Sequence, residues 1–192
     1  MPHRSRVDTF DLTRWARPAD SCERVVLAGL RGPVLDVGCG PGRLVAALAE
    51  SGTPALGIDI APMAFDLAAE RGAPMLALSV FDRVPAEGRW PSVLLIDGNI
   101  GIGGDPLALL RRVHELLAPG GLALVEVERP GLTSQRRTAR LEVAEGVMSW
   151  IPWAKVGVDG IPDLASRAGF AVEAIRRVGA RWFSWLRSGP PV

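Results

Sequence analysis

The chain has 192 residues, of which 48% are hydrophobic and 22% are charged, and its formal net charge is +1. The length fits one domain with its own core, and the composition excludes a disordered chain. No apolar run approaches the roughly 18 residues of a membrane span, and the small net charge gives no bulk attraction to nucleic acid or to a membrane surface. Because the N-terminal residues also lack the apolar segment of a signal peptide, we expect a cytoplasmic protein without nucleic-acid or membrane partners.

Cysteines are few, and the basic side chains are almost all arginines. Cys22 and Cys39 are too few for a disulfide framework or a cysteine zinc site, and we expect both to be reduced. No obvious cluster of acids indicates another kind of metal site. Arg136, Arg137 and Arg140 form the densest basic group, which is typical of a solvated helix face.

The first predicted element is a helix from Asp20 to Leu30, in which Asp20 is the N-cap and Glu23 completes a capping box. After it, short apolar runs alternate with segments whose apolar residues recur at helical spacing. The runs predict strands at 34–37, 55–60, 75–80, 93–97 and 122–127. The segments between them predict helices that end before Gly52, run from Pro62 to Arg71, and run from Asp105 to Leu117.

Residues 129–157 break this regular order, and we interpret them as an irregular insertion with a helix over 138–144. Regularity returns with a helix over 161–168 and with strands over 170–176 and 181–186, which form a hairpin. The pattern predicts an α/β, Rossmann-like, doubly wound fold with a mostly parallel seven-stranded sheet and a C-terminal antiparallel hairpin strand. We expect residues 20–192 to form this domain, residues 1–19 to form a tail or lid, and the insertion to cover the substrate.

A glycine-rich turn follows the first strand of the sheet, at the edge where doubly wound folds bind their ligands. Gly38, Gly40 and Gly42 let the backbone turn sharply and approach a ligand closely. Their spacing is shorter than the G-x-G-x-x-G of dinucleotide sites. Asp36 would repel a diphosphate but attract the cationic amino group of a methionine moiety. Asp59 ends the second strand, where its carboxylate can accept both ribose hydroxyls of an adenosine.

Three segments carry a family resemblance. Residues 34–42 resemble motif I of class I S-adenosylmethionine-dependent methyltransferases, residues 57–60 resemble the second motif, and residues 116–122 resemble the L-x-P-G-G stretch before strand five. The resemblance spans about residues 30–187 and implies S-adenosylmethionine as the cofactor. It implies that Asp36 and the glycine backbone hold the methionine portion, that Asp59 holds the ribose and that Ile60 lies against the adenine. The cofactor residues expected on this basis are Asp36, Gly38, Cys39, Gly40, Gly42, Asp59, Ile60, Val80, Phe81 and Asp97.

The end of the third strand departs from the family pattern. Many members carry an acid there that contacts the adenine amino group, whereas this chain has Ser79, Val80 and Phe81, with Asp82 slightly later. The backbone or Ser79 would then supply this contact, with Phe81 as a stacking surface.

Methyl transfer is an in-line displacement, so the protein mainly has to align the acceptor and exclude water, and a general base helps only an un-ionised acceptor. The glycine-rich segment 97–105 follows the fourth strand, where family members often shape the acceptor site. Asp97 and Asn99 in this segment and Glu126 in the fifth strand are the candidate catalytic residues. The alternatives are a flexible turn for the first two and a solvated strand-end charge for the third. The aromatic rings that could cover an acceptor, or simply pack in the core, are Trp15, Trp150 and Trp153.

Absent motifs narrow the class of acceptor. The chain has no tyrosine, so it lacks the Asn/Asp-Pro-Pro-Tyr motif of amino-methylating nucleic-acid enzymes, and it also lacks the Pro-Cys nucleophile of cytosine-C5 enzymes. The resemblance therefore implies an enzyme that methylates a small molecule. Three alternatives stay open, namely a cofactor-binding member without catalysis, an NAD-dependent oxidoreductase, and an interaction protein without a cofactor.

Overall fold

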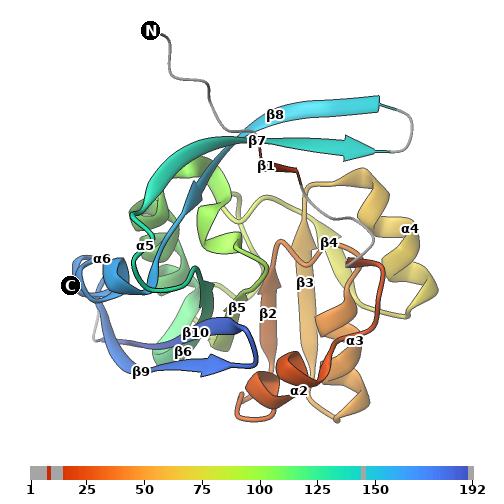
Figure 1. The fold of residues 1–192 in the computed structure, drawn as a ribbon. Coiled ribbons are helices and arrows are strands. Elements are labelled where there is room, and N and C mark those ends of the chain that lie inside the picture. The colour runs from red at the N-terminus through yellow and green to blue at the C-terminus, as the bar shows by residue number, and fades with distance from the viewer. Residues whose placement is uncertain (1–7, 10–14, 144–145, 190–192) are drawn as a thin grey trace, which may run out of the picture.

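The structure, a computed structural model, describes residues 8–9, 15–143 and 146–189. Its centre is a seven-stranded sheet in the order β4-β3-β2-β5-β6-β10-β9 (Figure 1). Strand β10 runs antiparallel to both of its neighbours, and the other neighbouring pairs are parallel. The predicted fold class is therefore confirmed. The strands of this sheet are Val34–Val37 (β2), Ala55–Asp59 (β3), Met75–Ala77 (β4), Trp90–Leu95 (β5), Leu117–Val127 (β6), Phe170–Val178 (β9) and Arg181–Ser188 (β10).

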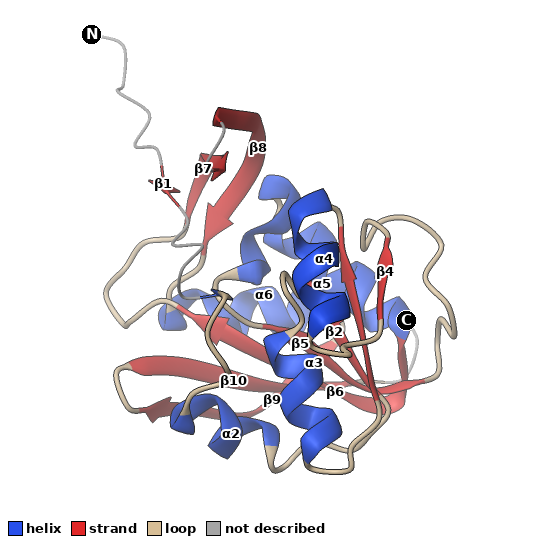
Figure 2. Ribbon diagram, turned by 90° about the vertical axis from the view of Figure 1, so that its right-hand side faces the viewer, coloured by secondary structure: helices blue, strands red, loops and turns tan. Residues whose placement is uncertain are grey.

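Helices cover both faces of the sheet (Figure 2). On one face Leu48 of α3 packs in a buried cluster that includes Leu94, and on the other face Leu110 of α5 packs in a cluster that includes Val93. Because these neighbouring β5 residues point to opposite faces and are both fully buried, the strand is buried on both sides, as its continuous apolar run predicted. The helices are Ser21–Leu27 (α2), Arg43–Glu50 (α3), Pro62–Glu70 (α4), Pro106–Leu116 (α5) and Ile161–Arg167 (α6), with 3-10 helices at Asn99–Gly104 (η1) and Val158–Gly160 (η2).

The elements of the sheet lie close to their predicted positions. The capping box of α2 is confirmed, because the Glu23 amide donates to Asp20 Oδ1 at 2.8 Å and the Asp20 amide donates to Glu23 Oε2 at 2.9 Å. Strand β4 ends at Ala77, earlier than predicted. Strand β6 starts at Leu117, but its pairing with β5 skips from there to Leu122. Residues 118–121 therefore interrupt the ladder between these two strands.

The insertion corrects a prediction from the sequence. The helix predicted over 138–144 is wrong up to residue 143, because Gln135–Val143 (β7) and Gly146–Lys155 (β8) form an antiparallel hairpin. Residue 144 lies outside the described residues. Asp8–Thr9 (β1) pairs with β7 in parallel and completes a separate three-stranded sheet. Arg136, Arg137 and Arg140 therefore lie on a strand and not on a helix face.

The β7–β8 hairpin lies over one end of the central sheet. Figure 1 shows β7 and β8 across the end of the molecule toward which β2 and β3 point. Residues of β8 lie directly against η1, where a Cβ on Gly104 would lie 3.0 Å from Cβ of Pro152. Among the described residues, no helix is both long and apolar enough to cross a membrane.

Candidate functional site

A cavity of about 400 Å³ opens at the carboxyl ends of β2, β3 and β5, which is the edge where doubly wound sheets bind ligands. Its lining comes from the turn after β2, from the residues that follow β3, β4 and β5, and from α4 and β8. Trp15 of the N-terminal segment also lines it. The predicted cofactor residues that the structure brings together here are Asp36, Gly38, Cys39, Gly40, Asp59, Ile60, Val80, Phe81 and Asp97.

The turn between β2 and α3 needs glycine for two different reasons. Gly38 and Gly40 have φ values of 71° and 49°, which residues with a side chain rarely adopt. Gly40 also faces open space, so its backbone is accessible to a ligand. Gly42 does not line the cavity, and a Cβ on it would lie 2.6 Å from Cβ of Ala73. We therefore assign Gly42 to packing and not to the predicted cofactor contact.

Asp59 at the end of β3 is fixed by two backbone amides. Its Oδ2 accepts a hydrogen bond from Gly40 at 2.8 Å, and its Oδ1 accepts one from Ala61 at 2.8 Å. These bonds connect the glycine turn to the start of α4 and hold the carboxylate at the cavity wall. Ile60 beside it is 65% exposed and supplies an apolar surface next to the carboxylate, as the predicted ribose and adenine contacts require.

Asp36 is buried at the end of β2, with 2% of its surface exposed. Its Oδ2 atom has no hydrogen-bond partner among the described residues. Burial raises the pKa of Asp36 from 3.8 to about 7, although the nearby guanidinium of Arg43 acts in the opposite direction. A buried carboxyl oxygen without a partner is unfavourable unless a ligand completes its hydrogen bonding. Asp36 can therefore receive a hydrogen-bond donor or a positively charged group of a ligand.

Cys39 follows Gly38 in the turn and is buried against β3. A Cβ added at Gly57 would lie 2.5 Å from its Sγ, so the thiol occupies the space that a side chain on β3 would need. Burial raises the pKa of Cys39, and the carboxylate of Asp36 acts in the same direction. Its thiol is therefore suited to packing and not to nucleophilic chemistry.

The segment after β4 forms the wall on which the family's adenine contact was expected. Ser79, Val80 and Phe81 all line the cavity. The Ser79 hydroxyl accepts a hydrogen bond from the Phe81 amide at 3.2 Å, and Phe81 is 48% exposed. Asp82 is not part of the lining, and its Oδ2 accepts from the Ser79 amide at 3.2 Å. Its carboxylate therefore shapes this loop.

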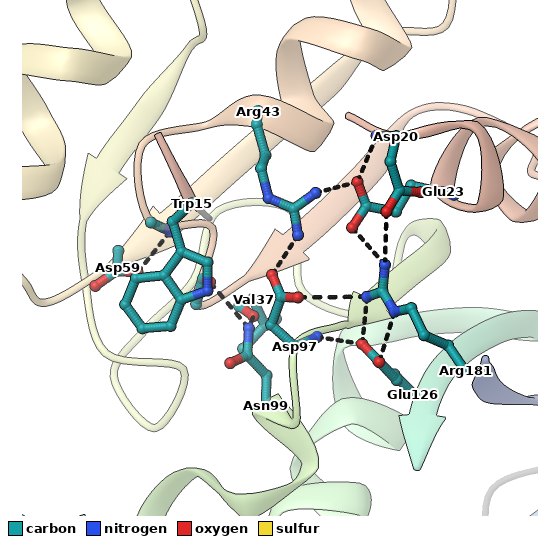
Figure 3. A network of polar contacts seen from close by, with 12 residues as sticks. Trp15, Asp20, Glu23, Val37, Arg43, Asp59, Asp97, Asn99, Glu126 and Arg181 are labelled. Carbon is teal, nitrogen blue, oxygen red and sulfur yellow. Dashed lines mark hydrogen bonds and ion pairs between the residues drawn. The ribbon is translucent and has the colours of Figure 1, made fainter. Parts of the chain in front are cut away.

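A network of buried and half-buried ion pairs lies beside the cavity (Figure 3). Arg43, the first residue of α3, donates hydrogen bonds to Glu23 and to Asp97. Arg181, at the start of β10, donates to Glu23 Oε1 at 2.5 Å and to both oxygens of Glu126, at 2.7 and 2.5 Å. It also reaches Asp97 Oδ1 at 3.3 Å. The network connects α2, α3 and the loop after β5 to the last described strand.

Asp97 and Arg43 are the network residues that line the cavity, and Asp97 has the more unusual backbone. Its φ is 58°, an uncommon value for a residue with a side chain, and such strain is characteristic of functional sites. Two arginines bind its carboxylate, and its amide donates to Glu126 Oε2 at 2.7 Å. Glu126 does not line the cavity. Glu126 therefore helps to hold Asp97 in place, and its position outside the cavity does not suit the catalytic base considered from the sequence.

Asn99 connects the loop after β5 to the glycine turn. Its side-chain Nδ2 donates to the carbonyls of Val37 and Gly38, at 2.8 and 2.9 Å. A Cβ on Gly38 would lie 2.7 Å from this nitrogen, so the close approach depends on the glycine. The flexible turn considered for Asn99 is therefore wrong, because η1 is anchored to the end of β2.

The glycines of η1 allow the β7–β8 hairpin to pack closely against this helix. A Cβ on Gly101 would lie 2.1 Å from the carbonyl oxygen of Ala154 and 2.6 Å from Nε1 of Trp153. Trp153 itself is buried and lines the cavity, whereas Trp150 is 54% exposed and does not line it. Of the three tryptophans considered as covers, Trp15 and Trp153 thus face the cavity.

Three charged residues of the network were not predicted as site residues. Glu23 was interpreted only as a helix cap, and Arg43 and Arg181 were not singled out. Arg43 carried a local signal, since it directly follows the glycine turn at the start of an apolar helix. Arg181 carried none, because it contacts Glu23 across 158 positions of sequence. Among the described residues, no group of His, Cys, Asp and Glu side chains could hold a metal ion.

Residues 10–175 match a protein family that is described as a methyltransferase domain. The chain belongs to this methyltransferase family. A ubiquinone biosynthesis O-methyltransferase of Cereibacter sphaeroides is 33% identical to this methyltransferase domain over 156 residues, which are 73% of this chain and 60% of that protein. A trans-aconitate 2-methyltransferase of Methylobacterium radiotolerans is 31% identical over 167 residues, which are 85% of this chain and 61% of that protein. The methyltransferase domain spans about three fifths of the length of these curated relatives.

A solved structure shows the same fold as this methyltransferase domain. It is a SAM-dependent methyltransferase from Bacteroides fragilis in complex with S-adenosyl-L-homocysteine, with a TM-score of 0.76 and 23% sequence identity. The similarity covers 94% of this chain and 83% of that chain. The family match confirms the resemblance drawn from the three sequence motifs, and it favours a methyl donor over a dinucleotide at the glycine turn.

Proposed function

We propose that the protein is an S-adenosylmethionine-dependent methyltransferase that acts on a small-molecule acceptor. The observation that carries the proposal is the buried Asp36 carboxyl group, whose Oδ2 has no partner among the described residues and which lines the cavity. The cofactor has an ammonium group that can complete this hydrogen bonding, and the charge attraction is strong away from water. Asp36, Asp59 and Asp97 around one cavity suit a ligand with cationic groups.

The residues of the cavity fit the parts of this cofactor. Asp36 and the open backbone at Gly40 would hold the methionine portion, and Asp59 would hold the ribose. Ile60 and Phe81 would cover the adenine. When bound, the cofactor supplies a methyl group on a positively charged sulfur, and the apolar wall of the cavity keeps water away from it.

The acceptor would lie against η1 and the β7–β8 hairpin. Asn99 and Trp153 line the cavity from these two elements, so they would orient an acceptor, and Trp15 with β8 would cover it. The curated relatives are named for small-molecule reactions, ubiquinone biosynthesis and trans-aconitate methylation. They support a small-molecule acceptor for this chain.

A second candidate function is cofactor binding without catalysis. It is favoured by the contacts of Asp97, the candidate base that lines the cavity, because Arg43 and Arg181 bind its carboxylate. The two candidate functions predict different results in a methyl-transfer assay. Incubation of the protein with methyl-labelled S-adenosylmethionine and a panel of carboxylates, phenols and amines should yield a labelled product for a methyltransferase and none for a binding protein.

The donor site is tested by calorimetric titration with S-adenosylhomocysteine. We expect Asp59→Asn to weaken its affinity roughly ten- to hundredfold, because the amide replaces a charged acceptor of hydrogen bonds. Asp66→Asn, on the exposed side of α4, is the matched control and should bind as the wild type does. Equal affinities of the Asp59 and Asp66 variants, or preferential binding of NAD by the wild type, would contradict the proposal.

A further inference from the structure

A second cavity of about 380 Å³ adjoins the first. Gly103, Pro152 and Trp153 line both cavities, so η1 and β8 form the partition between them. An acceptor whose reacting end lies beside Asn99 in the first cavity could therefore extend over this partition into the second. The residues specific to the second cavity then determine which acceptors fit.

The two cavities have opposite charge. Among the described residues, the charged side chains of the first are three aspartates and Arg43. Those of the second are Arg136, Arg137 and Asp105. The first cavity thus suits a cationic ligand and the second suits an anionic one.

The arginines of the second cavity are in a position to bind a ligand. Arg136 contacts Asp105 Oδ2 at 3.2 Å, and its side chain is 78% exposed. Such an exposed ion pair contributes little stability, so a ligand can replace it. Arg137 is half-buried and donates to Gln135 Oε1 at 2.8 Å. Trp150 in the same cavity is 54% exposed, and an exposed indole offers a flat apolar surface to a ligand.

We propose that the second cavity binds an anionic group of the methyl acceptor, a carboxylate or a phosphate, through Arg136 and Arg137. Guanidinium groups match the planar oxygen pairs of these anions and can bind them with two parallel hydrogen bonds. The apolar part of the acceptor then lies against Trp150 and Trp153. This inference rests on the proposed function, because it takes the first cavity as the donor site.

The proposal is tested by titrating benzoate, phenyl phosphate and the uncharged benzamide into protein saturated with S-adenosylhomocysteine. We expect at least one anion to bind roughly tenfold or more tightly than benzamide, and the better anion distinguishes a carboxylate site from a phosphate site. The double variant Arg136→Gln/Arg137→Gln should lose this difference. The double variant Arg167→Gln/Arg177→Gln removes the same charge from exposed positions outside both cavities and should retain it.

Two results would overturn the proposal. One is that wild-type protein binds neither anion more tightly than benzamide, and the other is that the Arg136/Arg137 double variant binds the anion as tightly as the wild type. Affinity for S-adenosylhomocysteine is measured for every variant and should stay unchanged, which shows that the protein is folded. If the wild type does not bind S-adenosylhomocysteine, the proposed function fails, whereas anion titration without it still tests the second cavity.

Discussion

At Asp36, burial and the neighbouring charge of Arg43 have opposite effects on the pKa of the carboxyl group. This carboxyl group lies in the cavity wall without a partner for Oδ2 among the described residues, and burial raises its pKa to about 7. The free protein therefore holds a proton there at pH values where an exposed aspartate has lost it. An ammonium group beside the carboxylate would release that proton, so binding and protonation are linked.

The raised pKa of Asp36 also predicts how the stability of the free protein depends on pH. The pKa of Asp36 is raised on folding, so its contribution is fully present below about pH 4 and is lost as the pH rises to about 7. Relative to Asp36→Asn, the wild type should lose roughly 1.4 kcal/mol of unfolding free energy per pH unit across this window. Urea denaturation of both proteins at several pH values measures the difference. A constant difference would contradict the assigned pKa.

The same residue predicts how ligand affinity changes with pH. The affinity for S-adenosylhomocysteine should rise as the pH increases toward about 7 and then level off, because the ionised carboxylate is the form that binds the ammonium group. In Asp36→Asn this rise should be absent. Calorimetric titration in buffers with different ionisation enthalpies would also detect the proton that the wild type releases.

The sequence predicted those residues of the cavity lining that belong to local motifs. Asp36, Gly40 and Asp59 lie within or just after strands, so their spacing along the chain already places them at one edge of the sheet. Gly42 belongs to the same motif, but its Cβ position faces Ala73. That distinction depends on how helix α3 packs, which the spacing of glycines does not encode.

The β7–β8 hairpin shows that contacts between distant segments also limit the prediction of a whole secondary-structure element. Residues 138–143 include Ala, Arg, Leu and Glu, which favour helices when judged locally. Their partners in β8 include Trp150 and Ile151, and pairing with such side chains can override the local preference. The prediction of a helix therefore failed where the conformation was determined by a neighbouring strand.

The contact of η1 with this hairpin gives a prediction about stability. Gly101→Ala would place a methyl group against the Ala154 carbonyl and the Trp153 ring, so we expect a loss of about 1–3 kcal/mol in unfolding free energy. Gly29→Ala is the control, because a Cβ there has no atom within 4 Å. Urea denaturation compares the two. The packing assigned to η1 would be wrong if both variants were as stable as the wild type.

At the scale of the whole molecule, the ion network is the feature that holds distant segments together. Arg181→Gln would remove the cation that pairs with the buried Glu23 and with the half-buried Glu126, so we expect the unfolding free energy to fall by about 3–5 kcal/mol. The exposed Arg167→Gln should change it by less than about 0.5 kcal/mol. Chemical denaturation measures both values, and a change of similar size in both would show that the network is not a buried unit.

The position of Arg181 in the sequence has a consequence for the order of folding. It lies in β10, and its contact with Glu23 closes a loop of 158 positions. Contacts of such long range form late, because the entropy of closing a long loop opposes them. The contact between Arg181 and Asp97 therefore forms only when β10 docks between β6 and β9. We expect a refolding chain to regain its secondary structure before it regains the ability to bind the methyl donor.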